Sequence, residues 1–217
     1  MTDSLELGGR ALAIEDVARV AREGAEVRLA DAARERIAHG RARLEELLAR
    51  GERIYGVNTG VGGNVGISLA PEQMEVMQHN LVRHLACATG QPLPRDVVRA
   101  ATLLRVVTFL TGASAVREET VDALAALLNR GLTPVVPRYG SVGASGDLMP
   151  SAYIGRVLVG MGEAEFQGRR LPAADALEAA GMSSDSPATK VVDGAVTLMT
   201  KLLPLEQAGS VKLRSKR

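Results

Sequence analysis

Apolar residues recur at helical spacing along most of this chain, and glycines and prolines separate one such stretch from the next. The pattern predicts helices over residues 14–21, 30–50, 71–88, 96–111, 116–128, 150–161 and 173–180. Extended segments are predicted at residues 5–7, 27–29, 134–137 and, as a hairpin, 163–171. The expected fold class is therefore mainly α with small β elements.

Two of the predicted helices differ in how their apolar residues are distributed. The helix over 96–111 is apolar on most of its sides, which predicts a buried helix. The helix over 71–88 is amphipathic, and its apolar stripe consists of Met74, Met77, Leu81, Leu85 and Ala88. Pro71 and Pro150 each suit the first position of a helix, because no N–H donor is needed there.

Composition and charge narrow the class of protein. The 217 residues carry 26 basic and 25 acidic side chains, so no strong field favours nucleic acid or an anionic membrane. Aromatic residues make up only 2%, which argues against platforms for stacked bases. No apolar run is long enough to span a bilayer, and the first residues lack a secretion-signal pattern. We therefore expect a cytoplasmic protein with no membrane or nucleic-acid partner and no metal site.

The single cysteine and the extent of the domain complete this description. Cys87 excludes an internal disulfide, and its apolar neighbours predict a small buried side chain. No internal repeat, long linker or low-complexity tract interrupts the chain. We expect one domain over residues 1–203 and a basic tail over 204–217, a type of sequence that is usually solvated.

Residues 140–150 read Gly-Ser-Val-Gly-Ala-Ser-Gly-Asp-Leu-Met-Pro, with the tripeptide Ala144-Ser145-Gly146 at their centre. Glycines open backbone conformations that other residues avoid, so the amide nitrogen of Gly146 can fold back onto the carbonyl of Ala144. Loss of two waters, one of them carrying the hydroxyl of Ser145, would leave a five-membered ring with an exocyclic methylene. Such a ring is a strong electrophile. The alternative is a flexible turn without chemistry.

Two further segments of the chain have a distinctive sequence. Residues 55–62 read Tyr-Gly-Val-Asn-Thr-Gly-Val-Gly, and residues 80–85 read Asn-Leu-Val-Arg-His-Leu. Together with residues 140–150, and in the same order and spacing, they resemble segments of the histidine, phenylalanine and tyrosine ammonia-lyases and aminomutases. In that family the ring is 4-methylideneimidazole-5-one (MIO). The resemblance implies the N-terminal MIO domain of the ammonia-lyase (aspartase/fumarase-like) fold, lacking most of the C-terminal helical bundle.

The resemblance also implies a reaction and roles for single residues. It makes Tyr55 the base that removes the β-proton of the substrate, with a hydrogen-bonded loop anchor as the alternative. Asn58 would contact the ring or the substrate, Gly62 would let the loop close over the substrate, and Asp193 would lie near the ring. The implied reaction removes ammonia from an aromatic L-amino acid and gives a trans-arylacrylate. A 2,3-aminomutase that uses the same ring is the alternative.

The pair His84-Leu85 bears on the substrate. By resemblance, tyrosine ammonia-lyases carry His-Leu here and direct the histidine to the phenolic hydroxyl, whereas phenylalanine enzymes usually carry Phe-Leu and histidine enzymes Ser-His. A buried imidazole left without a partner would penalise a substrate that lacks the hydroxyl. The pair therefore favours tyrosine or a related para-hydroxylated substrate. The alternative is that His84 pairs with protein.

Three features depart from the family pattern. The family usually continues its ring loop with Leu-x-Pro-Leu-x-His, whereas this chain has Ser151 in place of the second leucine and Tyr153 in place of the histidine. Asp193 replaces an asparagine, and a carboxylate cannot donate a hydrogen bond. The chain is also considerably shorter than the family members, whose C-terminal bundle drives tetramerisation and completes each active site across subunits.

Three explanations fit this length. The chain is one subunit of a split enzyme whose bundle lies on a second polypeptide, which we favour, or a truncation that is inactive alone, or a non-catalytic scaffold that keeps the loop. The apolar segments 96–111 and 191–205 need a covering surface. We therefore expect a homo-oligomer, or a hetero-oligomer with a chain that carries the missing helical bundle.

Overall fold

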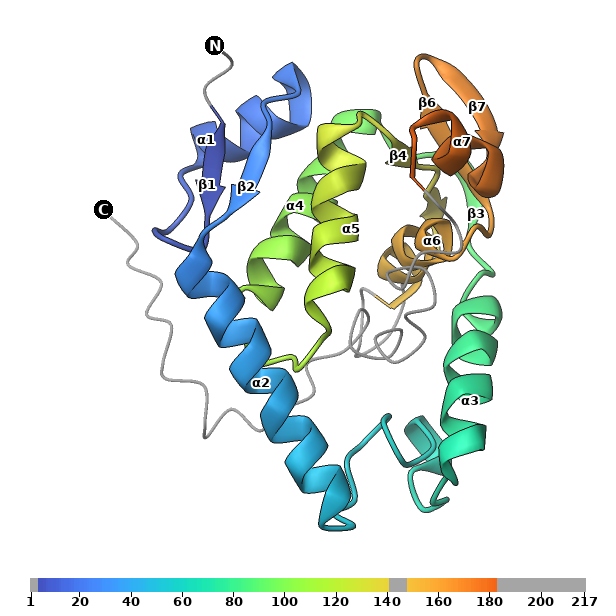
Figure 1. Cartoon of the computed structure of the whole chain (residues 1–217). Coiled ribbons are helices and arrows are strands. Elements are labelled where there is room, and N and C mark those ends of the chain that lie inside the picture. Colours follow the sequence, from blue (N-terminus) through green and yellow to red (C-terminus); the bar gives the residue numbers. More distant parts are fainter. Residues whose placement is uncertain (1–3, 141–147, 183–217) are drawn as a thin grey trace, which may run out of the picture.

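The computed structural model of the chain describes residues 4–140 and 148–182 (Figure 1). In chain order its elements are β1 (Leu5–Leu7), α1 (Ile14–Ala18), a π-helical turn (Arg19–Glu23), β2 (Val27–Leu29), α2 (Asp31–Ala49), a 3-10 turn (Gly62–Asn64), α3 (Pro71–His84), β3 (Thr89–Pro92), α4 (Arg95–Phe109), α5 (Glu118–Asn129), β4 (Thr133–Pro134), β5 (Pro137–Tyr139), α6 (Leu148–Leu158), β6 (Glu163–Phe166), β7 (Arg169–Pro172) and α7 (Ala173–Ala179). The prediction of a mainly α chain with small β elements is confirmed.

Helices α4 and α5 lie side by side at the centre, and the other elements lie around them (Figure 1). β1 and β2 form a parallel pair in which Leu5 lies opposite Val27. β6 and β7 form the predicted hairpin, and β4 pairs with the other edge of β6. The hairpin turns at Gln167 and Gly168, whose φ angles of 51° and 72° suit the type I′ turn that matches the twist of two strands.

The core is formed by the apolar faces of the two central helices and by the elements that pack on them. α5 contributes Val121, Leu124, Leu127 and Leu128, each at most 2% exposed. α4 contributes Val98, Leu103, Val106 and Phe109. These residues follow the helical spacing by which the elements were predicted, so the hydrophobic pattern accounts for the packing at the centre of the domain.

The prediction that the helix over 96–111 is apolar and buried on most sides is only half right. Val97 and Leu104 are 45% and 50% exposed. Because they are seven residues apart, they lie on one face of α4, and that face points away from the core. The physical reason is that the neighbouring elements cover the opposite face only.

The buried face of α4 contains an arginine, which the sequence pattern did not reveal. Arg99 is 1% exposed, and burial lowers its pKa. Its guanidinium donates hydrogen bonds to three backbone carbonyls, those of Val20, Ala21 and Leu128. Two of these belong to the π-helical turn and one to the last turn of α5, where unpaired carbonyls carry partial negative charge. The carbonyls therefore take the place of a carboxylate partner.

Helix α3 ends at His84, earlier than predicted. Thr89 pairs with Tyr139 in an antiparallel strand instead, and the positive φ of Gly90, 89°, cannot continue a helix. The residues between helix and strand are irregular. Cys87 lies among them and is exposed, so the prediction of a buried side chain is wrong.

Helix α6 begins earlier than predicted and also ends earlier. Pro150 is its third residue and not its first. A proline is tolerated anywhere in the first turn, because the N–H groups there have no partner within the helix. Proline therefore indicated the helix but not its first residue.

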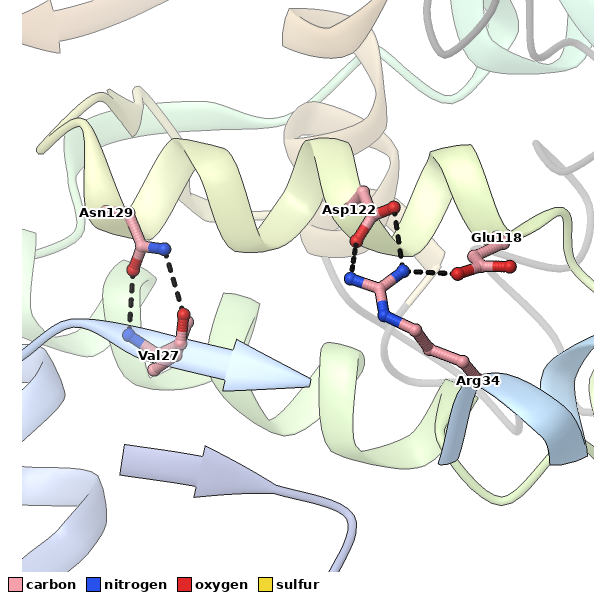
Figure 2. A network of polar contacts seen from close by, with 5 residues as sticks. All are labelled: Val27, Arg34, Glu118, Asp122 and Asn129. Atoms are coloured by element: carbon pink, nitrogen blue, oxygen red, sulfur yellow. Dashed lines mark hydrogen bonds and ion pairs between the residues drawn. The ribbon is translucent and has the colours of Figure 1, made fainter. Parts of the chain in front are cut away.

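Two sets of polar contacts fasten α5 to the N-terminal elements (Figure 2). The side-chain amide of Asn129 accepts a hydrogen bond from the N–H of Val27 at 2.8 Å and donates one to its carbonyl at 2.9 Å. Arg34 of α2 donates to both carboxylate oxygens of Asp122, at 2.8 and 3.0 Å, and also to Glu118. The hydrogen bonds with Asp122, and then with Glu118, raise the pKa of Arg34, so its charge is always present.

The turn after α4 lies directly on the backbone of α2. A Cβ atom at Gly40 would lie 2.0 Å from the carbonyl oxygen of Gly112, and a Cβ atom at Gly112 would lie 2.3 Å from that of Arg36. The Arg36 side chain closes the same contact, because its Nε donates to the carbonyl of Leu110 at 3.0 Å. Only glycine allows two backbones to approach this closely.

None of the helices among the described residues combines the length and the apolar character that crossing a membrane requires.

Candidate active site

Tyr55 lies at the start of the glycine-rich loop that follows α2. Its side chain is 42% exposed, and its hydroxyl oxygen accepts a hydrogen bond from the N–H of Gly62 at 2.9 Å. Because the oxygen is the acceptor, the hydroxyl proton is not used in this contact. Tyr55 thus makes the loop-anchoring contact that was the alternative to a role as base. This contact does not use the hydroxyl proton of Tyr55.

Hydrogen bonds within the loop fix its shape. The side-chain amide of Asn58 accepts from the N–H of Ile54 and donates to the carbonyl of Glu52, both at 2.7 Å. Thr59 is 2% exposed and accepts from the N–H of Gly56 at 3.0 Å. Side chains therefore hold this loop in place even though it is rich in glycine. A contact between Asn58 and substrate stays a prediction.

Gln78 joins this loop to α3. It is 3% exposed, and its Nε2 donates to the carbonyl of Gly56 at 2.9 Å. Gln78 and Leu85 are seven residues apart, so they share a face of α3 and are separated by about 10 Å along the helix. The loop that carries Tyr55 and the side chain of Leu85 therefore border the same face.

The pair His84-Leu85 stands at the C-terminal end of α3. His84 is exposed, and within the described part of the chain its imidazole has no hydrogen-bond or ion-pair partner. Leu85 is partly buried and packs against the core. The described residues therefore give no support to the alternative that His84 pairs with protein.

The tripeptide at 144–146 and Asp193 lie outside the described residues, and so does the whole of the predicted tail over 204–217. The residues that flank the tripeptide are described. A Cβ atom at Gly140 would lie 2.8 Å from the Sδ atom of Met149. Gly140 and Met149, on either side of the tripeptide, therefore lie in close contact.

Ser151, one of the departures from the family pattern, is explained by α4. It is 8% exposed, and its hydroxyl accepts a hydrogen bond from Nη2 of Arg105 at 3.0 Å. The same guanidinium lies over the ring of Phe109, 5.9 Å from its centroid. A polar contact thus ties α6 to α4 at the position where the family pattern has a leucine.

Sequence reasoning missed two residues of this region. Gln78 is a polar residue on the apolar face of an amphipathic helix, and that position was the signal that could have revealed it. Met149 is an apolar residue in an apolar helix, and nothing in the sequence distinguished it. Its contacts with Gly140 and Cys87 depend on the tertiary structure.

Comparison with known sequences identifies the class of protein. The sequence profile of the aromatic amino acid lyases matches residues 12–190, and the chain belongs to this family. It is 47% identical over 182 residues to a histidine ammonia-lyase of Gloeobacter violaceus, covering 84% of this chain and 35% of that protein. It is 40% identical over 211 residues to a histidine ammonia-lyase of Symbiobacterium thermophilum, covering 97% of this chain and 41% of that protein. The chain thus spans roughly two fifths of the length of these relatives or less.

Comparison with solved structures gives the same fold. The chain is similar to the phenylalanine aminomutase of Pantoea agglomerans, with a TM-score of 0.80 and 32% identity over 90% of this chain and 37% of that one. It is similar to the tyrosine aminomutase of Streptomyces globisporus, with a TM-score of 0.81 and 29% identity over 91% and 36%. The predicted ammonia-lyase fold is confirmed. The relatives named here as ammonia-lyases act on histidine, so the comparisons do not support the prediction of tyrosine.

Proposed function

We propose that the chain forms the ring-bearing part of an enzyme that eliminates ammonia from an aromatic L-amino acid. The observation that carries the proposal is that Gln78 ties the Tyr55 loop to the face of α3 that also carries Leu85. The separation of about 10 Å along that face is comparable with the length of an aromatic amino acid. In this proposal the β-carbon of the substrate lies near Tyr55, and its para-hydroxyl is directed towards His84, which adjoins Leu85 at the end of α3.

The flanking residues fit a ring formed from residues 144–146. Gly140 and Met149, which stand on either side of the tripeptide, approach each other closely, and this supports the proposal. The sequence Ala-Ser-Gly supplies the hydroxyl that must leave and a glycine nitrogen free to attack. When formed, the ring supplies an electrophilic methylene that reacts with the substrate amine.

The chain's own residues would then position the substrate and move one proton. The N–H of Gly62 holds the oxygen of Tyr55 in place. As a phenolate, having lost its own proton, that oxygen would take the β-proton of the substrate as a general base. Asn58 and Thr59 would keep the loop in the required shape through their hydrogen bonds within it.

For the substrate we propose tyrosine. The support is the pair His84-Leu85 and the imidazole of His84, which has no partner among the described residues and can accept the hydrogen bond that a phenolic hydroxyl donates. An exposed imidazole becomes selective only when a partner or substrate removes it from water, because water would otherwise satisfy it.

Histidine is the second candidate substrate, favoured by the names of the relatives from Gloeobacter violaceus and Symbiobacterium thermophilum. An aminomutase reaction is favoured by the names of two similar structures. Lyase and mutase share the first step and differ in how long the amine is retained, so product analysis separates them.

We further propose that the active enzyme includes helical polypeptide beyond the described residues, either as a continuation of this chain or on a second one. The exposed apolar face of α4 at Val97 and Leu104 supports a covering surface. The larger size of the relatives supports the same idea.

The first prediction concerns the mass of the chain. We expect the purified chain to be lighter than its sequence by the mass of two water molecules, because ring formation from residues 144–146 releases two waters. Intact-mass spectrometry measures this directly. The Ser145→Ala variant, which lacks the leaving hydroxyl, should have its full sequence mass. A full-mass parent chain, purified together with any partner, would contradict the proposed chemistry.

The second prediction concerns substrate choice. We expect His84→Phe to lower the preference for tyrosine over phenylalanine about 10- to 100-fold, because the hydroxyl loses its partner. The measurement compares kcat/KM for tyrosine, phenylalanine and histidine with the enzyme in its active form. His39→Phe, on exposed α2, is the matched control and should leave the preference unchanged. A parent enzyme that prefers histidine would favour the second candidate instead.

A further inference from the structure

Residues 86–88 form a short irregular segment between α3 and β3, directly after the pair His84-Leu85. The last helical hydrogen bond runs from the N–H of Leu85 to the carbonyl of Leu81, at 3.0 Å. From there to the pairing of Thr89 with Tyr139, no regular secondary structure fixes the backbone. Ala86 still donates to the carbonyl of Arg83 at 3.1 Å, so only the position of residues 87 and 88 is set by what packs against them.

Two elements that flank the ring tripeptide converge on Ala88. From the end of β5, Gly140 is so close that a Cβ atom there would lie 2.6 Å from the Cβ and 2.9 Å from the Cα of Ala88. From α6, the hydroxyl of Tyr153 donates to the carbonyl of Ala88 at 3.3 Å, a long and therefore weak hydrogen bond. The neighbouring Cys87 contacts the sulfur of Met149 at 3.8 Å. The segment is thus held from both sides.

The ring of Tyr153 is itself held in place. Arg156, one turn further along α6, has its guanidinium carbon 5.3 Å from the centroid of that ring. The Nε of Arg156 is buried and has no hydrogen-bond partner among the described residues, so the face of the ring is a main contact of this charge. This contact favours the ring orientation in which the hydroxyl reaches Ala88.

We propose that Tyr153 is a positioning residue for substrate selection: it holds Ala88 against α6 and thereby fixes the place of His84 and Leu85. The proposal rests on the proposed function, in which this pair meets the ring of the substrate. It gives a role to the tyrosine that stands where the family pattern has a histidine. Tyr153 does not touch the substrate in this account and acts only through the backbone of the 86–88 segment.

The test compares Tyr153→Phe with the matched control Tyr139→Phe, which removes a hydroxyl from a neighbouring exposed tyrosine. In the 217-residue chain, we expect Tyr153→Phe to speed amide hydrogen exchange over residues 85–90 about 3- to 10-fold, because one tie of the segment is lost. Tyr139→Phe should leave it unchanged. Both variants should keep the mass deficit of the parent chain. Equal exchange in the two variants would overturn the proposal.

The second measurement separates positioning from a merely structural effect. In the active enzyme, Tyr153→Phe should lower the ratio of kcat/KM for tyrosine to that for phenylalanine about 3- to 10-fold. In the His84→Phe background the same change should alter this ratio much less, because the imidazole that distinguishes the two substrates is gone while Leu85 remains. An equal effect in both backgrounds, or none in either, would refute the proposal.

Two further outcomes are distinguished. If Tyr153→Phe does not fold, Met149→Leu removes the sulfur contact at similar volume, and the same shift in hydrogen exchange is expected or the proposal fails. If the parent enzyme shows neither the mass deficit nor turnover, the proposed function fails. An active parent whose substrate ratio does not respond to Tyr153→Phe would instead refute the positioning role alone.

Discussion

Replacing Tyr55 with phenylalanine is expected to lower kcat by about 10²- to 10⁴-fold, the usual contribution of a general base. The variant should keep the ring, because the tyrosine takes no part in its formation, and mass spectrometry would show the unchanged deficit. Turnover is followed by the absorbance of the arylacrylate product. A variant that keeps the parent kcat would show that Tyr55 only anchors the loop.

The anchoring contact requires a control for loop structure. The phenylalanine variant also loses the hydrogen bond from the N–H of Gly62, an exposed contact that water can replace. We therefore expect only a small change in the free energy of unfolding. Tyr139→Phe is the matched control, since this tyrosine is 63% exposed and lies outside the loop. If both variants lost turnover equally, the effect would not belong to Tyr55.

The largest effect on stability is expected from Gly112→Ala. The new Cβ would lie 2.3 Å from the carbonyl oxygen of Arg36, and the φ angle of 75° disfavours any side chain. Because the obstacle is backbone in the middle of α2, relief requires the helix and the turn to separate. We expect the free energy of unfolding to fall by about 2–5 kcal/mol, the sum of backbone strain and overpacking.

A second glycine, Gly51, separates the contribution of overpacking from that of backbone strain to the fall in the free energy of unfolding. Gly51 has a φ angle of 77°, and a Cβ there would have nothing within 4 Å. Gly51→Ala should therefore cost only the conformational part, about 1–2 kcal/mol. Denaturant titrations with equal m-values measure both variants. Equal losses for the two would mean that the turn moves away from α2 at little cost, contrary to the close approach described here.

The hydrophobic pattern predicted the elements of the centre because local spacing decides them. α5 and the hairpin that turns at Gly168 were found from apolar periodicity and turn residues alone. The end of α3 was missed because it is decided by a partner: Thr89 pairs with Tyr139, which is far away in the sequence. The buried Arg99 was missed for a related reason, since carbonyls from two distant turns receive its hydrogen bonds.

The candidate site divides in the same way. Tyr55 and His84 were found because they stand in segments that resemble the family, and the structure then supplied the hydrogen bond to Gly62. Gln78 and Tyr153 donate hydrogen bonds to the carbonyls of Gly56 and Ala88, and no local sequence pattern predicts these partners. Residue types can be recognised from a motif, but the backbone groups that position them are set by tertiary packing.

The amide of Asn129 has a consequence for the order in which the chain acquires its structure. It completes the hydrogen bonds of Val27, from which it is separated by 102 residues in the sequence. Arg34 is likewise separated from its partner Asp122 by 88 residues. During synthesis, the first strand pair therefore emerges long before the helix that supplies its partners. Closing so long a segment costs entropy that only the packed core offsets. β1 and β2 are thus made long before the helix that completes the hydrogen bonds of Val27.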